Sequence, residues 1–268
     1  EMKQLNLFLD SVRIENQFIT FNGKHHWPNK SILSEAITML EVNAMQDSYI
    51  PVNKSMAHDY LQNNLTRVQE LKQINSPDSL ALACAIANRT YQTLTKIADV
   101  ASLKSTIEEL SQMPMLQKFL KEQSAIEEYE IQKQNEFSSS FGSKQLAWWM
   151  NEIKKLNREN DGLRGDVSKR LRGFISLSCY SYVNAAMQYQ DWKAVQYFSS
   201  IYIQVDPEIP DSWYAQACLQ ANTGKPTDAI KSLKNAVKYG LTDYSKIQND
   251  PLLVKIRGLD EFQSILKK

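Results

Sequence analysis

The chain has 268 residues, of which 43% are hydrophobic and 23% are charged, so it can bury the core of one large or two modest domains. Its 31 Lys and Arg residues balance 30 Asp and Glu residues, which excludes both the broad basic field of a nucleic-acid-binding protein and an acidic tail. No stretch approaches the roughly 20 apolar residues of a membrane-spanning helix, so we expect no transmembrane segment.

Glycine and proline are sparse and unevenly placed. The chain has 8 Gly and 8 Pro, and 118 residues separate Gly23 from Gly142 without another glycine. Strands joined by tight turns need frequent glycines, whereas long helices do not. We therefore predict an all-α protein, a helical bundle or α-solenoid.

Helical periodicity fills the first half of the chain. We predict helices over 2–16, 31–46, 52–75, from Pro77 to about Val100, and over 115–136, with an irregular segment over 17–30. Ser76-Pro77-Asp78 is a strong helix start, and Leu33, Ile37, Leu40 and Ala44 form one apolar stripe. Whether Ser105-x-x-Glu108 begins a new helix or lies inside one stays open. The serine-rich segment 138–143 is the best linker, and it bounds an N-terminal region, 1–141, that resembles no family.

The second region, 142–268, opens with predicted helices over 144–159 and about 166–189, joined by a loop over 161–165. Trp148 and Trp149 are neighbours on the first of these helices. Because neighbouring side chains on a helix point about 100° apart, we expect one of the two to lie in the core.

A 34-residue period follows. The segments 176–209 and 210–243 have this length, and the second reads PDSWYAQACLQANTGKPTDAIKSLKNAVKYGLTD. With Trp213 at position 4, Ala217 at position 8, Ala229 at position 20 and Ala236 at position 27, it resembles a tetratricopeptide repeat. The first segment matches less closely. The tail, 244–268, is similar to the segment that caps such arrays and covers their apolar end.

The resemblance implies a peptide-binding groove lined by the first helix of each repeat. Carried over by position, it implies as groove residues Tyr180, Asn184, Met187, Gln188, Asp211, Tyr214 and Asn222, together with Leu177, Cys218 and Ala221. Tyrosine stands where some family members place a lysine that clamps a peptide carboxylate. An apolar or aromatic peptide is therefore the expected ligand. In the alternative, helices from upstream fill the groove.

Signals for catalysis are weak. The pair His25-His26 and the single His58 lack a third ligand at a metal-binding spacing, and Cys84, Cys179 and Cys218 lie in apolar stretches without a Cys-x-x-Cys pair. We expect buried free thiols, no metal, no cofactor and no enzyme activity.

The expected function is that of a non-catalytic scaffold or binding module for a protein or peptide partner. One alternative is a structural subunit or surface lipoprotein of a larger complex, and another is an enzyme or small-ligand binder that uses the N-terminal helices. The chain begins Glu1-Met2, which indicates a processed N-terminus. We therefore expect an exported protein, periplasmic or at the cell surface, rather than a cytoplasmic one, with a lipid anchor upstream of residue 1 as one means of attachment.

Overall fold

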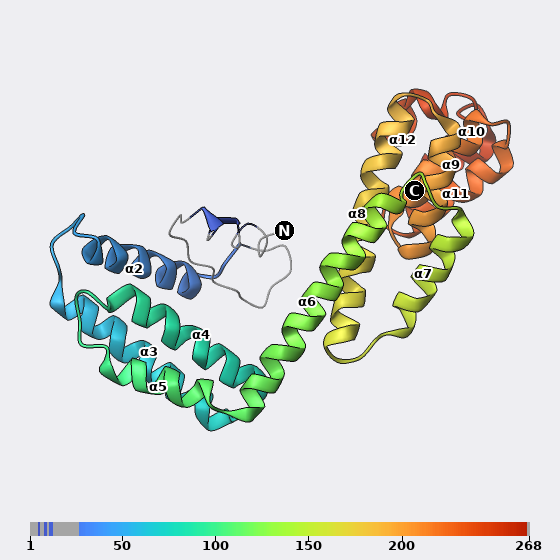
Figure 1. Cartoon of the computed structure of the whole chain (residues 1–268). Helices are drawn as coiled ribbons and strands as arrows, with labels where there is room; N and C mark the ends of the chain where they lie inside the picture. The colour runs from blue at the N-terminus through green and yellow to red at the C-terminus, as the bar shows by residue number, and fades with distance from the viewer. Residues whose placement is uncertain (1–4, 6–7, 10, 13–26, 267–268) are drawn as a thin grey trace. The chain divides into compact units, whose positions relative to one another are not determined.

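The protein is helical throughout the part that the computed structural model describes, which is residues 5, 8–9, 11–12 and 27–266 (Figure 1). These residues form twelve α-helices and one 3-10 helix and contain no strand. The all-α prediction is therefore confirmed. The predicted helix over 2–16 lies largely outside the described residues, and His25-His26 lie wholly outside them.

The chain divides into two compact units, Glu1–Glu122 and Gln123–Lys268. It passes from one to the other within α6 (Pro114–Ser140), whereas the sequence places the boundary at residue 141. The linker predicted over 138–143 is wrong, because its first three serines form the last turn of α6. Ser139 donates its hydroxyl hydrogen to the carbonyl oxygen of Glu136, so the serine is satisfied within the helix.

The first unit contains α2 (Lys30–Gln46), α3 (Lys54–Ile74), α4 (Pro77–Leu94) and α5 (Ala101–Ser111). The side chains of Asn29, Asn53 and Ser76 accept backbone N–H groups at the starts of α2, α3 and α4, which satisfies donors that have no partner within the helix. The helix predicted to run to Val100 ends at Leu94, and the Ser105-x-x-Glu108 motif lies inside α5.

Helix α2 has two apolar stripes, and the structure buries the one that the sequence analysis did not choose. Met39, Val42 and Met45 are buried, whereas Ile37 is 58% exposed and Leu40 is 64% exposed. Both stripes have helical spacing, and spacing alone does not say which one faces a neighbouring helix. The predicted helix is confirmed, and the apolar stripe named from the sequence is not the one that α2 buries.

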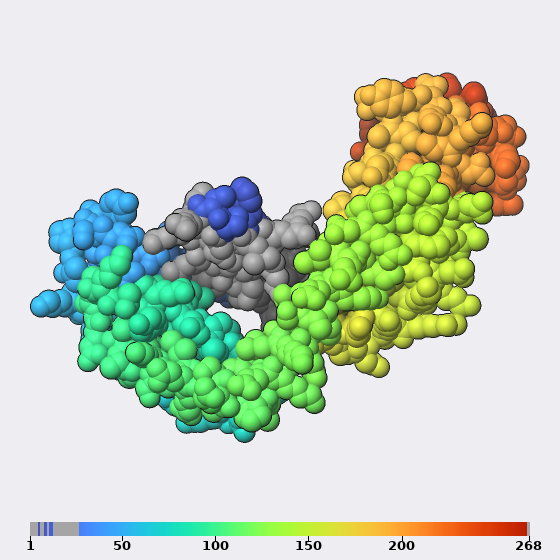
Figure 2. Space-filling model, in the orientation of Figure 1, coloured from blue at the N-terminus to red at the C-terminus, as the bar shows by residue number. Residues whose placement is uncertain are grey.

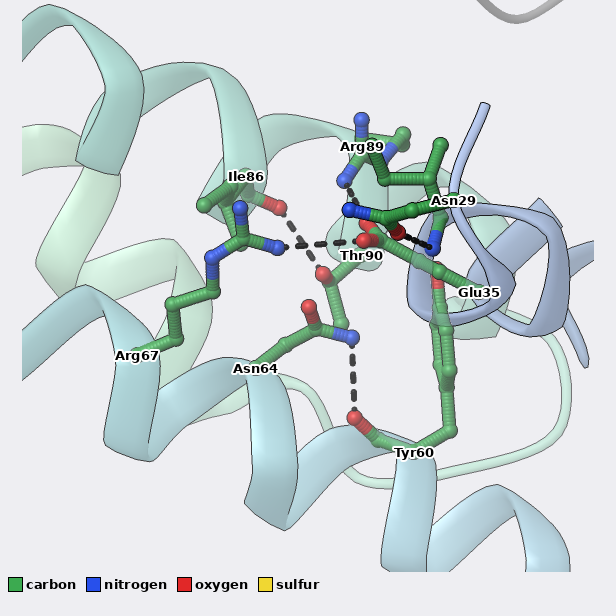
Figure 3. A network of polar contacts seen from close by, with 9 residues as sticks. Asn29, Glu35, Tyr60, Asn64, Arg67, Ile86, Arg89 and Thr90 are labelled. Carbon is green, nitrogen blue, oxygen red and sulfur yellow. Dashed lines mark hydrogen bonds and ion pairs between the residues drawn. The ribbon is translucent and has the colours of Figure 1, made fainter. Parts of the chain in front are cut away.

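An ion-pair network ties three helices of this unit together (Figure 3). Glu35 of α2 accepts from Arg89 of α4 at 2.6 Å and from Arg67 of α3 at 3.1 Å. The Glu35 and Arg89 side chains are only 21% and 16% exposed, so water screens this contact less than it screens a pair on the open surface. The network fixes the position of α2 against the α3–α4 pair.

The second unit continues with α7 (Leu146–Arg158), α8 (Gly162–Gln188) and α9 (Trp192–Val205). Helix α8 starts at Gly162, four residues earlier than predicted, so most of the expected loop over 161–165 is helical. Gly165 explains the early start, because a Cβ there would lie 2.4 Å from the carbonyl carbon of Asn160. Only glycine lets the chain approach this closely.

The chain ends with α10 (Pro210–Asn222), α11 (Pro226–Lys238), α12 (Tyr244–Asn249), the 3-10 helix η1 (Pro251–Leu253) and α13 (Asp260–Leu266). The starts of α9 and α11 are 34 residues apart, as are the starts of α10 and α12. Ala217, Ala229 and Ala236 are fully or almost fully buried, as predicted. Figure 2 shows the surface of these closing helices in orange to red.

A buried carboxylate joins α6 to α7. Glu152 is 7% exposed at its side chain and accepts from Lys155 at 2.5 Å and from Lys133 at 3.1 Å. Burial raises the pKa of Glu152, but the hydrogen bonds and charges of the two lysines outweigh it, so the pKa lies below its usual value. The ionised carboxylate therefore stabilises the folded unit.

Replacing this group gives a pH-dependent prediction. The substitution Glu152→Gln should lower the free energy of unfolding by about 1–3 kcal/mol at neutral pH. Because the folded pKa is depressed, the advantage of the wild type is present above the pKa of the unfolded chain and shrinks as the pH falls through the folded value. Urea unfolding of both proteins across acidic pH checks this. The exposed-site variant Glu128→Gln is the control, and a loss that does not change with pH would contradict the assignment.

Candidate functional site

Helix α8 presents two different stripes. Its buried side carries residues at helical spacing that pack into the second unit, namely Val167, Leu171, Ile175, Cys179 and Val183. On another side, Leu177, Tyr180, Asn184 and Gln188 follow one another at intervals of three and four residues, and all four are exposed. We call these four residues the α8 stripe. Leu177 is 62% exposed and Tyr180 is 43% exposed.

The residues 34 positions later lie on α10 and have a different environment. Asp211, Tyr214, Cys218 and Asn222, which we call the α10 stripe, correspond in order to the four residues of the α8 stripe. Tyr214 is 3% exposed and Cys218 is fully buried. Two helix faces at equivalent positions therefore differ, one open and one covered.

The cover is the chain's own segment from α12 to η1, residues 244–253, which we call the cap segment. The hydroxyl of Tyr214 donates to Oδ2 of Asp250 at 2.5 Å. The amide Nδ2 of Asn222 donates to the carbonyl oxygen of Leu252 at 2.7 Å. Lys246 places its ammonium 4.7 Å from the centre of the Tyr214 ring.

The course of the chain explains this cover. Helix α12 has only six residues and ends before Pro251, which lacks the N–H that a helix interior needs. Asp250 then accepts the N–H of Leu252 through Oδ1 and turns the chain into η1. The turn brings a carboxylate and a backbone carbonyl onto the α10 stripe.

The protonation of Tyr214 fits its role as a donor. Burial raises the pKa of Tyr214, and the neighbouring Cys218 and Asp250 act in the same direction. The phenol therefore keeps its proton at any physiological pH and can donate it to Asp250.

The remaining residues that the sequence analysis named as groove residues do not join the open stripe. Met187 is half-buried and packs against the core, Ala221 is buried, and Asp211 is half-buried near the start of α10. The alternative in which upstream helices fill the groove does not describe the α10 stripe. The covering segment comes from downstream and lies on α10; the resemblance of the tail to an array cap indicated such a cover, but not its contacts with Tyr214 and Asn222.

Removing the Tyr214 hydroxyl tests the cap. We expect Tyr214→Phe to cost about 1–2 kcal/mol, because the carboxylate of Asp250 loses a buried donor while the ring packing stays. Amide hydrogen exchange over residues 250–253 should become faster. Tyr189→Phe is the matched control, since that tyrosine is 80% exposed. Unchanged exchange in the cap segment would contradict the role given to this hydrogen bond.

Groups suited to chemistry are scarce in the described residues. Cys84, Cys179 and Cys218 are free thiols, as expected, and the last two are buried. Within the described part of the chain, no group of three or more His, Cys, Asp or Glu residues is placed to hold a metal ion. None of the described helices combines the length and the hydropathy required to cross a bilayer.

The chain matches no family model, no curated protein and no solved structure. The candidate site therefore depends on the geometry of α8, α10 and the cap segment.

Proposed function

We propose that the chain is a non-catalytic binding module that holds an extended peptide of a partner protein on the α8 stripe, within a pair of tetratricopeptide-like repeats. The observation that carries the proposal is the difference between the two stripes. The α10 stripe is covered by the chain's own cap segment, whereas the equivalent Leu177, Tyr180, Asn184 and Gln188 are exposed.

The cap segment indicates what chemistry such a stripe accepts. On α10, a tyrosine hydroxyl donates to a carboxylate and a side-chain amide donates to a backbone carbonyl. Tyr180 and Gln188 supply the same two donors at the equivalent positions of α8. A peptide with an acidic side chain near Tyr180 and a backbone carbonyl near Gln188 would satisfy both.

Leu177 adds an apolar contact that α10 lacks, because Asp211 occupies the equivalent position. The parts of Leu177 and Tyr180 that are exposed in the free protein gain from burial by a partner at roughly 25 cal/mol per Å². We therefore expect the bound peptide to carry an apolar side chain next to its acidic residue.

The thiols support a non-catalytic role. Burial raises the pKa of both Cys179 and Cys218, so neither is a thiolate at neutral pH. A nucleophilic cysteine needs the opposite shift. The proposal therefore assigns no covalent step to the second unit.

Peptide selection tests this proposal. A phage-displayed library of random peptides is selected against the full chain, and the selected peptides are measured for binding to the wild type and to Tyr180→Ala. We expect the selected sequences to combine an acidic and an apolar residue and to bind Tyr180→Ala more weakly. Tyr189→Ala, the control, changes a more exposed tyrosine at the end of α8 that lies off the stripe. Equal binding to wild type and Tyr180→Ala would refute the proposal.

A further inference from the structure

A cavity of about 600 Å³ lies within the first unit, between the first turns of α3 and the connection from α4 to α5. Its volume falls in the range of known small-ligand sites. The residues that line it are Lys54, Ala57, His58, Leu61, Gln62, Ile97, Ala98, Asp99, Ala101 and Ser102. It is separate from the α8 stripe and does not depend on the function proposed there.

Half of the lining residues are apolar, and we call these five the floor of the cavity. Leu61 and Ile97 supply aliphatic side chains, and three of the lining residues are alanines. Alanine side chains leave the space open, since longer side chains from α3 or α5 would fill it. Leu61 is 7% exposed and belongs to the core of the unit, so the floor is a fixed surface rather than a mobile one. An apolar group of the ligand would be buried against it.

The other five lining residues are polar, and we call them the rim of the cavity: Lys54, His58, Gln62, Asp99 and Ser102. Lys54 and His58 stand one helical turn apart on α3, and their side chains form no ion pair or hydrogen bond with any described residue. Asp99 is the one acidic group among the described lining residues, and its Oδ1 already accepts the N–H of Ala101 at 3.0 Å. Asp99 keeps its negative charge, since that N–H is neutral, but it forms no ion pair with Lys54, so the Lys54 ammonium is a lining cation that no described carboxylate pairs with.

We propose that this cavity binds a ligand in which an apolar group carries a carboxylate. The apolar group would occupy the floor of Leu61, Ile97 and the alanines, and the carboxylate would accept from Lys54, with His58 beside it. A free aryl or alkyl carboxylic acid has this chemistry, and so does the C-terminal residue of a peptide that ends in an apolar side chain.

Three probes of one shape and different charge test the proposal. 3-Phenylpropionate, 3-phenylpropanol and 3-phenylpropylamine are titrated into the full chain, and the methyl NMR signals of Leu61 and Ile97 are followed. We expect the acid to shift these signals and to bind about fivefold more tightly than the alcohol, because one partly exposed ion pair with Lys54 contributes about that much. The amine should bind most weakly, because its charge has the same sign as that of Lys54. The proposal is wrong if the amine binds as tightly as the acid, or if no probe shifts these signals at millimolar concentration.

Variants of the protein test the carboxylate contact and the apolar contact of the ligand separately. Lys54→Gln should weaken the acid about fivefold and leave the alcohol unchanged, whereas Lys104→Gln, an exposed lysine of α5 outside the cavity, should change neither. Ala98→Leu places a larger side chain in the cavity and should abolish binding of both. If Ala98→Leu fails to fold, as judged by circular dichroism, the comparison of Lys54→Gln with Lys104→Gln alone decides the test. Equal effects of Lys54→Gln on acid and alcohol would overturn the charge assignment.

Two peptides distinguish the sources of the carboxylate. Acetyl-Ala-Ala-Phe is titrated with a free C-terminus and as the amide. Tighter binding of the free acid than of 3-phenylpropionate supports the proposal with a peptide terminus as ligand, and binding of 3-phenylpropionate alone supports it with a free acid. If both peptides bind measurably and with equal affinity, the result would contradict the proposal.

Discussion

Trp149→Ala is expected to lower the free energy of unfolding of the second unit by about 3–5 kcal/mol, the range for removing a large buried aromatic side chain. Trp149 is fully buried, stacks on Phe141 with ring centres 4.5 Å apart, and packs against Phe137. Its indole N–H donates to the hydroxyl of Tyr197 at 2.8 Å. The substitution removes the aromatic contacts and the donor together and leaves a cavity where α7 meets α9.

Urea unfolding followed by far-UV circular dichroism measures this loss. Because the chain has two compact units, the unfolding curve is fitted with a separate transition for each unit. Trp27→Ala is the control, since that tryptophan is 91% exposed and its removal should change stability by less than about 0.5 kcal/mol. If Trp149→Ala lowered the free energy of unfolding as little as Trp27→Ala does, the aromatic cluster around Trp149 would not hold the second unit together.

The second large effect concerns binding. Replacing Leu177 and Tyr180 together by serine should weaken the selected peptides by at least about 30-fold, the effect of losing one interface hot spot of about 2 kcal/mol. The free energy of unfolding should change by less than about 0.5 kcal/mol, because both side chains are exposed in the free protein.

The comparison with Tyr189→Ser makes this result specific. Tyr189 is more exposed than Tyr180 but lies off the α8 stripe, so its loss should leave the affinity unchanged. Fluorescence anisotropy with labelled peptides measures all three proteins. A general loss of affinity in both variants would indicate adhesion to exposed aromatic side chains rather than recognition by the stripe.

Local patterns predicted the helices well and their packing partners less well. The Ser76-Pro77-Asp78 start and the alanines of the second repeat had one consistent interpretation, and the structure confirms the helix start and the burial of Ala217, Ala229 and Ala236. On α2, by contrast, two apolar stripes compete, and the choice between them depends on how α2 packs against α3 and α4, which the pattern within α2 does not contain.

In the candidate site too, the sequence predicted which residues are equivalent but not which neighbours they contact. The 34-residue period placed Tyr180 and Tyr214 at equivalent positions, yet one is exposed and the other is buried. That difference comes from Asp250 and Leu252, which reach α10 only because Pro251 ends α12 and the chain turns. A position-by-position comparison of repeats does not contain this contact. The cavity beside His58 was missed for a similar reason, because its walls come from α3 and from the connection between α4 and α5.

Oxidative footprinting by hydroxyl radicals tests the central claim most directly, because it reports the solvent access of individual tyrosines by mass spectrometry. In the free protein, Tyr180 and Tyr189 should be oxidised readily and Tyr214 should be protected by the cap segment. Addition of a selected peptide should protect Tyr180 and leave Tyr189 unchanged. Oxidation of Tyr214 at the rate of Tyr180, or a Tyr180 that the bound peptide does not protect, would contradict an open α8 stripe beside a closed α10 stripe.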